Sequence, residues 1–297
     1  MTVLVTGGTG FVGPHVVHAL RAKERPVRVL ARKPDKQGQL RAWGCELVQG
    51  DMTDADSLRR AVEGCEAVVH LVALPPFADP KATQRVMEQG TRDLVAAAKE
   101  AGVGRFVLMS ALGTSERTKD LAAYFHAKWD EEQAVKESGL EHTIFQPSFI
   151  FGRDGGMLPA LIRVVRWSPV TPVVGTKKLQ PIWVEDVAAY FAKALSAKAA
   201  VNQTFELAGP DVVTFAELNE RIRRALGKRR LAFQTPTGLL KAGAAAGSLL
   251  PPLRGARDGV AMLEFEDNVT DITRAVEALG VKPITLEEQL RRATARA

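Results

Sequence analysis

The sequence predicts an α/β fold, with a doubly wound parallel sheet and a smaller C-terminal lobe. Through the first half of the chain, short apolar runs rich in β-branched residues alternate with segments of helical period, which is typical of parallel strands joined by crossover helices. A glycine-rich turn directly follows the first apolar run. After Gly152 the alternation loosens, which indicates a lobe that also returns strands to the main sheet.

The first half contains six predicted strands, at Val3–Thr6, Val27–Ala31, Glu46–Gln49, Ala67–Leu71, Arg105–Met109 and His142–Gln146. The helix after the first strand has Val12, Val16 and Leu20 on one face. Pro14 lies in its first turn, where the missing N–H group has no partner to lose. Further helices are expected near 55–63, 82–101 and 119–138. A sheet of this kind binds its ligand beyond the carboxyl ends of its strands.

The second half is expected to form the smaller lobe. Helical patterns near 156–167, 186–197 and 214–227 alternate with short strands near 171–174, 180–184 and 203–207. The segment Thr237–Leu250 is apolar and rich in small residues. We interpret it as a helix packed on the lobe, with an interfacial membrane helix as the alternative.

Composition favours a soluble, folded protein. The 297 residues are 46% hydrophobic and 25% charged, and the mean hydropathy is -0.05, so apolar surface suffices for a core. No uncharged apolar run reaches the roughly 18 residues that a membrane span needs. The chain starts with the strand-like Val3–Val5, so we expect neither a span nor a secretion signal.

The two cysteines, Cys45 and Cys65, lie near glycines in predicted connecting segments. Neither belongs to a Cys-x-x-Cys or Cys/His ligand spacing. We therefore expect a cytoplasmic protein without a metal centre.

The net charge of +6 is concentrated at one end of the chain. Residues 1–34 contain six Lys or Arg side chains and one acidic side chain. A local cation cluster beside a glycine turn suits a small anionic ligand, whereas a nucleic-acid binder usually interleaves basic residues with stacking aromatics. Aromatic residues make up only 6% of the chain, so we expect no nucleic-acid partner.

The strongest motif is the glycine turn Thr6–Gly13, which has glycines at Gly7, Gly10 and Gly13 between the first strand and the first helix. Glycines permit a tight turn, and the helix N-terminus offers unpaired N–H groups and a positive dipole end to a pyrophosphate. The sequence therefore predicts a dinucleotide site that also uses Thr9, Phe11 and Val12. We expect residues 1–150 to form the dinucleotide-binding core and residues 151–297 the substrate-side lobe.

The ends of the second and third strands predict how the nucleotide is recognised. An NAD-selective site normally carries an acidic residue after the second strand, but this chain has Arg32 and Lys33. A guanidinium binds a ribose 2′-phosphate, so we expect NADPH to be preferred over NADH, with a solvated surface arginine as the alternative. Asp51 and Met52 follow the third strand, where Asp51 is placed to accept from the adenine amino group and Met52 to pack on the ring. Asp54 is expected to cap the next helix.

Tyr124 and Lys128 stand four positions apart on a predicted helix that follows the fifth strand. This spacing places both side chains on one helix face, so the ammonium is expected to lower the pKa of the phenol and to hold a nicotinamide ribose. We interpret Glu131 and Glu132 as a solvated face of the same helix. Asp186 is expected to cap or support packing.

The remaining basic and histidine side chains are interpreted as structural. The basic run Lys228–Arg230 reads as a helix C-terminus. The five histidines have no spacing that predicts a triad or a metal site, and they are His15, His18, His70, His126 and His142.

Together these residues resemble the short-chain dehydrogenase/reductase superfamily, in its extended and atypical branch, which includes epimerase/dehydratase-like proteins. The resemblance runs from Thr2 to about Gly209, through Thr6–Gly13, Gly50–Asp51, Gly90–Thr91, Ser110, Tyr124–Lys128, Pro147–Ser148 and Val184–Ala188. The segments Ser110–Gly113 and Tyr124–Trp129 are similar to bacterial relatives of the nucleotide-binding accessory subunit of respiratory complex I.

The resemblance implies a Rossmann fold that binds NAD(P) on the glycine turn. It implies that Tyr124 is the acid/base residue, that Lys128 is its lysine and that Ser110 is a catalytic hydroxyl. By position, Pro147 and Ser148 then flank the nicotinamide. Two positions depart from the family pattern: Met87 stands where an Asn is common, and Leu112 where many members have a catalytic Ser or Thr, with Thr114 a distant substitute.

Two functions follow from these residues. The first is an NADP(H)-dependent oxidoreductase that transfers hydride to or from a carbonyl or carbinol carbon, with Tyr124 as acid/base. The second is a non-catalytic, NADPH-bound structural or redox-sensing partner of a respiratory or membrane complex. The Tyr124–Lys128 pair favours the first, and Met87 and Leu112 favour the second. The lobe carries no charge cluster that identifies the substrate.

Overall fold

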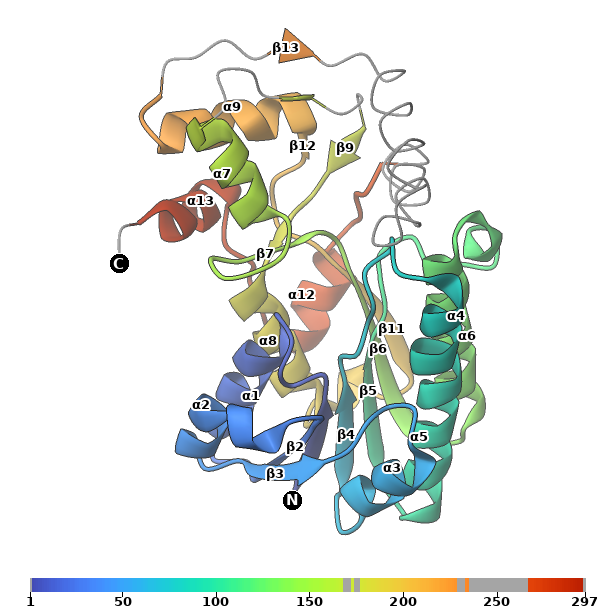
Figure 1. Ribbon diagram of the computed structural model, residues 1–297. Coiled ribbons are helices and arrows are strands. Elements are labelled where there is room, and N and C mark those ends of the chain that lie inside the picture. The colour runs from blue at the N-terminus through green and yellow to red at the C-terminus, as the bar shows by residue number, and fades with distance from the viewer. Residues whose placement is uncertain (1, 168–171, 174–176, 229–232, 235–266, 296–297) are drawn as a thin grey trace.

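The computed structural model describes residues 2–167, 172–173, 177–228, 233–234 and 267–295 (Figure 1). Seven parallel strands form the central sheet in the order β11-β6-β5-β4-β1-β2-β3. Their bounds are β1 Val3–Thr6, β2 Val27–Ala31, β3 Glu46–Gln49, β4 Ala67–His70, β5 Arg105–Met109, β6 Glu141–Pro147 and β11 Gln203–Leu207. The predicted doubly wound parallel sheet is confirmed, and β11 from the second half pairs with β6 as a returning strand. The strand order reverses between β1 and β4, which makes this the switch point.

Helices cover both faces of the sheet, because successive strand side chains point to opposite sides. In β1, Val3 and Val5 belong to one buried cluster and Leu4 to the other. The first face carries α1 Gly13–Arg21, α2 Gly38–Ala42, α8 Val184–Ala194 and α12 Thr273–Leu279. The second face carries α3 Ala55–Val62, α4 Pro80–Thr83, the π-helix Gln84–Gln89, α5 Gly90–Glu100 and α6 Ala123–Glu137. Short 3₁₀ turns occupy Pro34–Lys36, Lys119–Leu121 and Lys198–Ala200.

The C-terminal lobe has a hydrophobic core of its own, which includes Phe151, Trp183 and Leu218. Its helices are α7 Leu158–Trp167, α9 Phe215–Ala225 and α13 Leu286–Thr294. Its strands form two-residue pairs, β7 Ile150–Phe151 with β10 Ile182–Trp183, β9 Lys178–Leu179 with β12 Val213–Thr214, and β8 Pro172–Val173 with β13 Phe233–Gln234. This lobe lies above the core in Figure 1, on the side where the sheet strands end.

Two acidic side chains have the structural roles expected from the sequence. Asp54 accepts from the backbone N–H groups of Asp56 and Ser57 and so caps α3. Asp186 accepts from the N–H of Ile284 at 2.9 Å, which fastens α8 to the C-terminal segment.

Cys45 and Cys65 are buried free thiols, in the segments that precede β3 and β4. Two sequence interpretations fall outside the described residues: that of Thr237–Leu250, and the last two residues of the basic run, Arg229 and Arg230.

Candidate functional site

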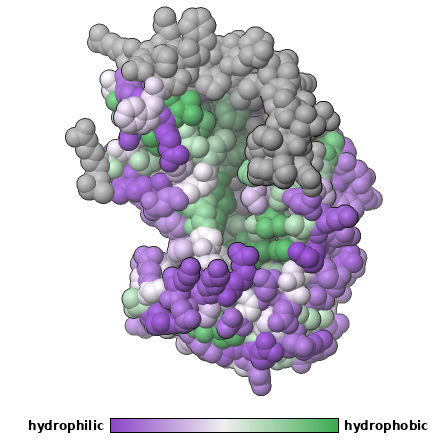
Figure 2. All heavy atoms as spheres, in the orientation of Figure 1, coloured by the Kyte–Doolittle hydropathy of each residue, from purple (hydrophilic) through white to green (hydrophobic). Residues whose placement is uncertain are grey.

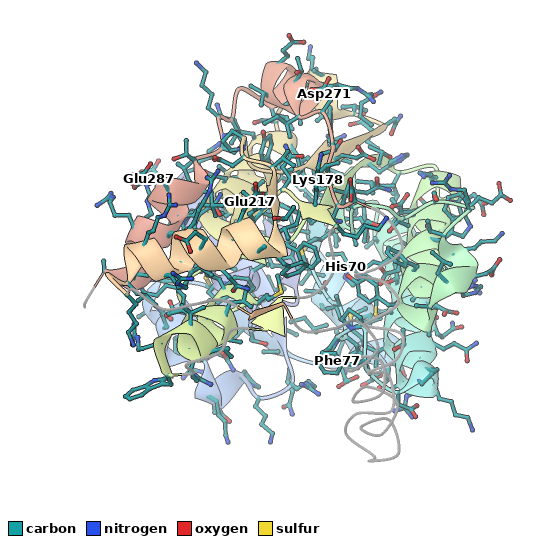
Figure 3. All side chains as sticks on the ribbon, turned by 90° about the horizontal axis from the view of Figure 1, so that it is seen from above. His70, Phe77, Lys178, Glu217, Asp271 and Glu287 are labelled. Carbon is teal, nitrogen blue, oxygen red and sulfur yellow. The ribbon has the colours of Figure 1, made fainter. Side chains whose placement is uncertain are left out.

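The carboxyl ends of the sheet strands meet beneath the lobe. Figure 3 is seen from the lobe side, and His70, the last residue of β4, lies near its centre. In Figure 2 the surface is hollowed between lobe and core, and hydrophobic residues gather in the hollow. Ligands of doubly wound sheets bind at this edge, beside the switch point.

The glycine turn has the backbone geometry of an anion site. Gly7 has a φ of +74°, in the left-handed region that favours glycine. The N–H of Gly10 donates to the carbonyl oxygen of Gly7 at 3.0 Å. A Cβ on Gly13 would lie 2.3 Å from that same oxygen, so α1 approaches the strand closely only because Gly13 has no side chain. A Cβ on Gly10 would meet only the Gly7 oxygen, at 3.4 Å. The turn is therefore tight at Gly13 and open at Gly10.

The N-terminus of α1 has no competing ligand of its own. Val12 provides no side-chain cap, and the first turn contains no acidic residue. No acidic side chain of the first turn therefore competes for the N–H groups and the positive dipole end of the helix, which suit an anion.

Phe11 points away from the open side of the turn. Its ring occupies the space that Cβ atoms on Gly152, Gly155 and Gly156 would need, at distances of 2.7, 2.2 and 3.0 Å. The three glycines have no side chains, so the Phe11 ring packs directly against their backbone. This contact holds the glycine turn against the lobe. Only the backbone of Phe11 remains on the turn itself.

Arg32 and Lys33 are exposed directly after β2, as a residue reading a 2′-phosphate has to be. Asp51 follows β3 and accepts from the N–H and the hydroxyl of Thr53 at 2.9 and 2.8 Å. These bonds, and then the charge of Arg32, lower the pKa of Asp51. Met52 is buried at 6% exposure within the core, beneath the start of α5.

Tyr124 and Lys128 lie on α6, as predicted. Lys128 is fully buried, and its ammonium donates to the carbonyl oxygen of Met109 at 2.9 Å and to Glu131 at 2.8 Å. Tyr124 is half-buried. The charge of Lys128 lowers the pKa of Tyr124, as expected, but burial raises this pKa more, and Glu131 raises it further. The net shift of the Tyr124 pKa is therefore upward.

The interpretation of Glu131 and Glu132 as a solvated face is also wrong, because both are buried, at 0% and 1% exposure. Glu132 accepts from the hydroxyl of Ser110 at 2.6 Å and from the amide of Gln146 at 2.7 Å, and it pairs with Lys136 at 3.0 Å. Ser110, directly after β5, and Gln146 on β6 thus supply the hydrogen bonds that water would give to an exposed carboxylate.

Sequence reasoning missed how His70, Thr91 and Glu131 come together. The His70 ring contacts Thr91 at 2.9 Å, and the Thr91 hydroxyl donates to Glu131 at 3.2 Å. One signal was available: Glu131 stands seven positions after Tyr124 and three after Lys128, which places all three on one helix face.

The two departures from the family pattern are apolar and buried. Met87 is fully buried in the π-helix, and its sulfur accepts from the N–H of Leu74 at 3.3 Å. Leu112 is 7% exposed. Neither offers a side-chain hydrogen bond of the kind that an Asn or a Ser would.

At the end of β6, Pro147 and Ser148 are tied to their surroundings. The Pro147 carbonyl accepts from the N–H of Leu112 at 2.9 Å. The hydroxyl of Ser148 donates to Asn268, which links the end of β6 to the C-terminal segment.

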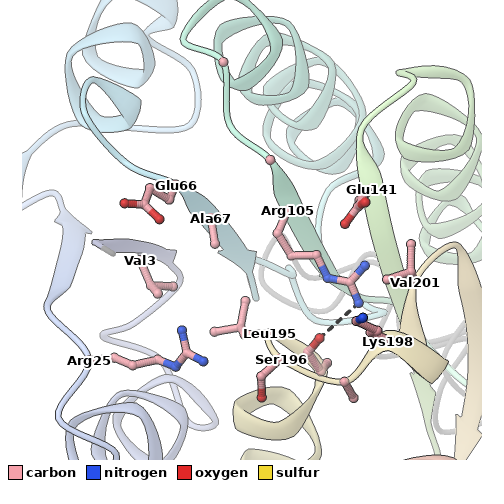
Figure 4. Close-up of a pocket in the computed structure, with 14 residues that line it drawn as sticks. Val3, Arg25, Glu66, Ala67, Arg105, Glu141, Leu195, Ser196, Lys198 and Val201 are labelled. Carbon is pink, nitrogen blue, oxygen red and sulfur yellow. Dashed lines mark hydrogen bonds between the residues drawn. The ribbon is translucent and has the colours of Figure 1, made fainter.

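A cavity of about 450 Å³ lies at the opposite, amino-terminal edge of the sheet (Figure 4). It is lined by the starts of β1, β4 and β5, at Val3, Ala67 and Arg105, and by the end of α8. The Arg105 guanidinium is committed to Ala194 and Thr143, at 3.0 and 2.6 Å, so its contacts serve the fold. This cavity is separate from the site beneath the lobe.

Within the described ranges, no group of three or more His, Cys, Asp or Glu side chains could hold a metal ion. In the same part of the chain, no helix is long and apolar enough to cross a membrane.

The fold and the glycine turn define a dinucleotide-binding protein of the Rossmann class. A family model described as NAD(P)H-binding matches residues 7–198, and the chain belongs to this NAD(P)H-binding family. The expected NAD(P)-binding family and the expected relatives among complex I subunits are confirmed. Solved reductase and epimerase structures share the fold.

Ceramide reductase of Caulobacter vibrioides is 34% identical over 188 residues, which are 63% of this chain and 58% of that protein. This chain thus spans little more than half of that relative. The 40 kDa subunit of mitochondrial NADH-ubiquinone oxidoreductase from Neurospora crassa is 26% identical over 289 residues, 95% of this chain and 76% of that protein. An NADPH-dependent quinone oxidoreductase of Escherichia coli, solved in complex with NADPH, shares the fold, with a TM-score of 0.79, 23% identity and coverage of 97% and 98% of the two chains.

Proposed function

We propose that this protein is an NADPH-dependent reductase of the atypical short-chain dehydrogenase/reductase class, acting on a carbonyl or quinone. The observation that carries the proposal is the pair Tyr124 and Lys128 on one face of α6, at the sheet edge where the glycine turn lies. When bound, NADPH supplies a hydride to the substrate carbon. Tyr124 donates the proton that the substrate oxygen takes up.

The residues present fit the nucleotide. The open space at Gly10 and the uncapped N-terminus of α1 suit a pyrophosphate. Gly7, Thr9, Phe11, Val12 and Gly13 contribute the backbone of this turn. Pro147 and Ser148 would flank the nicotinamide. Lys128 is completely buried and donates to Met109 and Glu131, so its third N–H group is the one left to hold the ribose.

Recognition of the adenosine half is assigned to the ends of β2 and β3. Arg32, assisted by Lys33, would bind the 2′-phosphate, since both are exposed and the position carries no acidic side chain. Asp51 keeps acceptor capacity on its second oxygen for the adenine amino group. Met52 lies mostly in the core, so its share in the adenine pocket is limited to the edge it still exposes.

The lobe is assigned to the substrate. Within residues 151–297, the described side chains that include Phe151, Trp183 and Leu218 form a separate hydrophobic core over the carboxyl edge of the sheet. Residues 1–150 contain the glycine turn and the Tyr124–Lys128 pair. The two free thiols support a cytoplasmic location.

A second candidate function rests on Ser110. Ser110 is 3% exposed, its hydroxyl donates to Glu132 at 2.6 Å, and the neighbouring Leu112 offers no replacement. A missing hydrogen-bond donor to the reacting oxygen raises a barrier by roughly 3–4 kcal/mol. The alternative is therefore a non-catalytic, NADPH-bound structural or redox-sensing partner of a respiratory or membrane complex, a role supported by the Neurospora crassa relative.

A substrate panel decides between the two. The protein is incubated with NADPH and with quinones, aldehydes, ketones or keto-sugars, and NADPH absorbance is followed. Oxidation that requires one of these compounds supports the reductase. Bound NADPH without oxidation above background across the panel would replace it with the structural role.

A further inference from the structure

A buried hydrogen-bond network centred on Glu131 shares a helix face with Tyr124. Tyr124, Lys128 and Glu131 share one face of α6, and the last two are completely buried. The Lys128 ammonium lies 2.8 Å from one Glu131 oxygen. The other Glu131 oxygen accepts from the hydroxyl of Thr91 on α5, at 3.2 Å. The carboxylate thus receives hydrogen bonds on both oxygens.

The network continues through His70 to Thr6, its register partner on β1. Because Thr91 gives its only hydroxyl proton to Glu131, it has to accept from Nε2–H of His70, at 2.9 Å. Nδ1 of His70 then accepts from the Thr6 hydroxyl, at 2.5 Å. From Thr6 through His70 and Thr91, each donor points toward the Glu131 carboxylate. Lys128 donates both to this carboxylate and to the Met109 carbonyl. The hydrogen bonds that Glu131 accepts stabilise its ionised form.

The charged groups around Glu131 come from two elements. On α6 they are Lys128, Asp130, Glu132 and the phenol of Tyr124. On β4 His70 stays neutral, since burial lowers its pKa to about 3. Glu132 is neutralised by Lys136 at 3.0 Å, and Asp130 by Arg92. Glu131 is therefore the carboxylate that compensates Lys128.

Burial raises the pKa of Glu131 to about 7, even though Lys128 and Thr91 oppose the shift. At alkaline pH, where phenols titrate, Glu131 is thus ionised. Glu131 then offsets part of the attraction between Lys128 and the Tyr124 oxygen, so a phenolate gains less stabilisation than it would beside Lys128 alone.

We propose that Glu131 is a positioning residue, the counter-ion that neutralises Lys128 and keeps Tyr124 protonated, so that the site is set for reduction of a carbonyl or quinone rather than oxidation of an alcohol. This inference rests on the proposed function. Reduction moves one hydride from NADPH to the substrate and one proton from the Tyr124 oxygen to the substrate oxygen, and the phenolate then takes a proton from water. Oxidation of an alcohol has to begin from the phenolate, which Glu131 disfavours.

Tyrosinate absorbance tests the proposal without any turnover. The chain has two tyrosines. Tyr190 is 1% exposed, its hydroxyl donates to the Val281 carbonyl at 3.0 Å, and burial raises its pKa strongly. The transition at lower pH therefore belongs to Tyr124, and Tyr124→Phe verifies the assignment by abolishing it.

Glu131→Gln is expected to lower the midpoint of this transition by about one pH unit or more, because Lys128 is then uncompensated. Glu132→Gln is the matched control: it removes a charge from the neighbouring buried position but leaves the Lys128–Glu131 pair intact, so its shift is expected to be less than half as large. An unchanged midpoint in Glu131→Gln would overturn the proposal.

The double variant Lys128→Met/Glu131→Gln tests the same proposal if Glu131→Gln does not fold. Both members of the buried pair are then neutral, so no uncompensated charge is left in the core. Its midpoint is expected to return close to that of the parent protein. A midpoint well above the parent value would show that Glu131 does not cancel Lys128, and would refute the proposal. A shifted midpoint in a protein that oxidises no NADPH would instead retain the counter-ion role and reject only the reductase.

Discussion

A Cβ atom on Gly13 would lie 2.3 Å from the carbonyl oxygen of Gly7, whereas one on Gly10 would meet the same oxygen at 3.4 Å. The two glycines of one motif therefore serve different ends. Gly13 is needed for the approach of α1 to β1, and Gly10 leaves room on the side where we propose that the pyrophosphate binds. Substitutions at Gly13 should therefore affect folding, and substitutions at Gly10 should affect binding.

Gly13→Ala is expected to reduce the free energy of unfolding by at least about 2 kcal/mol, because the methyl group collides with backbone that packing holds in place. Urea denaturation measures the loss. Gly38→Ala is the matched control, since Gly38 begins α2 and a Cβ there meets nothing within 4 Å. Comparable losses in both variants would show that the close approach at Gly13 is unimportant.

Gly10→Val is expected to fold like the parent protein and to lose dinucleotide binding, because its side chain would fill the space assigned to the pyrophosphate. Calorimetric titration with NADPH, together with a circular dichroism spectrum, checks both parts. Parental affinity in a normally folded variant would place the phosphate site elsewhere.

Arg32→Ala is expected to erase most of the preference for NADPH. A charge-assisted bond to phosphate contributes roughly 1.5–3 kcal/mol, so the parent protein should bind NADPH at least about tenfold more tightly than NADH. Calorimetry with both nucleotides measures the ratio. Lys36→Ala, which removes an exposed charge four positions later, should leave the ratio unchanged. Equal affinities in the parent protein would contradict the assignment.

Tyr124→Phe is expected to lower turnover by a factor of roughly 10²–10⁴ while NADPH still binds, because only the donated proton is lost. Steady-state rates and calorimetry separate the two effects. Robust turnover by this variant would mean that another group is the acid.

Lys128→Ala is expected to reduce the free energy of unfolding by about 3–5 kcal/mol, because it leaves the Glu131 carboxylate buried without its cation. The double variant Lys128→Met/Glu131→Gln should recover most of this loss. Chemical denaturation without nucleotide measures both. A single variant as stable as the parent would show that the buried pair contributes little.

The burial of His70 is expected to make the free energy of unfolding fall at acidic pH. Its pKa falls from 6.5 to about 3 on burial, so an unfolded His70 takes up a proton that the folded protein excludes. The resulting stability is present above pH 6.5 and is lost as the pH falls toward 3. Between about pH 7 and about pH 5 the loss is about 2 kcal/mol.

His70→Gln should remove this part of the pH dependence. Urea denaturation at both pH values gives the difference, and His126→Gln, a change on the exposed part of α6, should retain the parental dependence. A parental slope in His70→Gln would show that His70 is protonated in the folded protein.

Local patterns in the sequence determined the sheet core. The four strands Val3–Thr6, Val27–Ala31, Glu46–Gln49 and Arg105–Met109 occur with their predicted bounds. A short β-branched run or a glycine turn is specified by neighbouring residues, since steric limits on the backbone act over a few positions. The glycine turn and the Tyr124–Lys128 pair could be recognised for the same reason.

Only the tertiary structure decided the charge state around Tyr124. From the sequence, the adjacent carboxylates Glu131 and Glu132 look like a solvated face, because the hydroxyl groups that they bind belong to residues 40 and 22 positions away, Thr91 and Ser110. Whether a carboxylate is hydrated or buried depends on which distant donors the fold brings to it, and only those donors make burial of its charge tolerable. The candidate residues of the site could thus be named from the sequence, whereas their electrostatics came from the packing of α5 and α6 on the sheet.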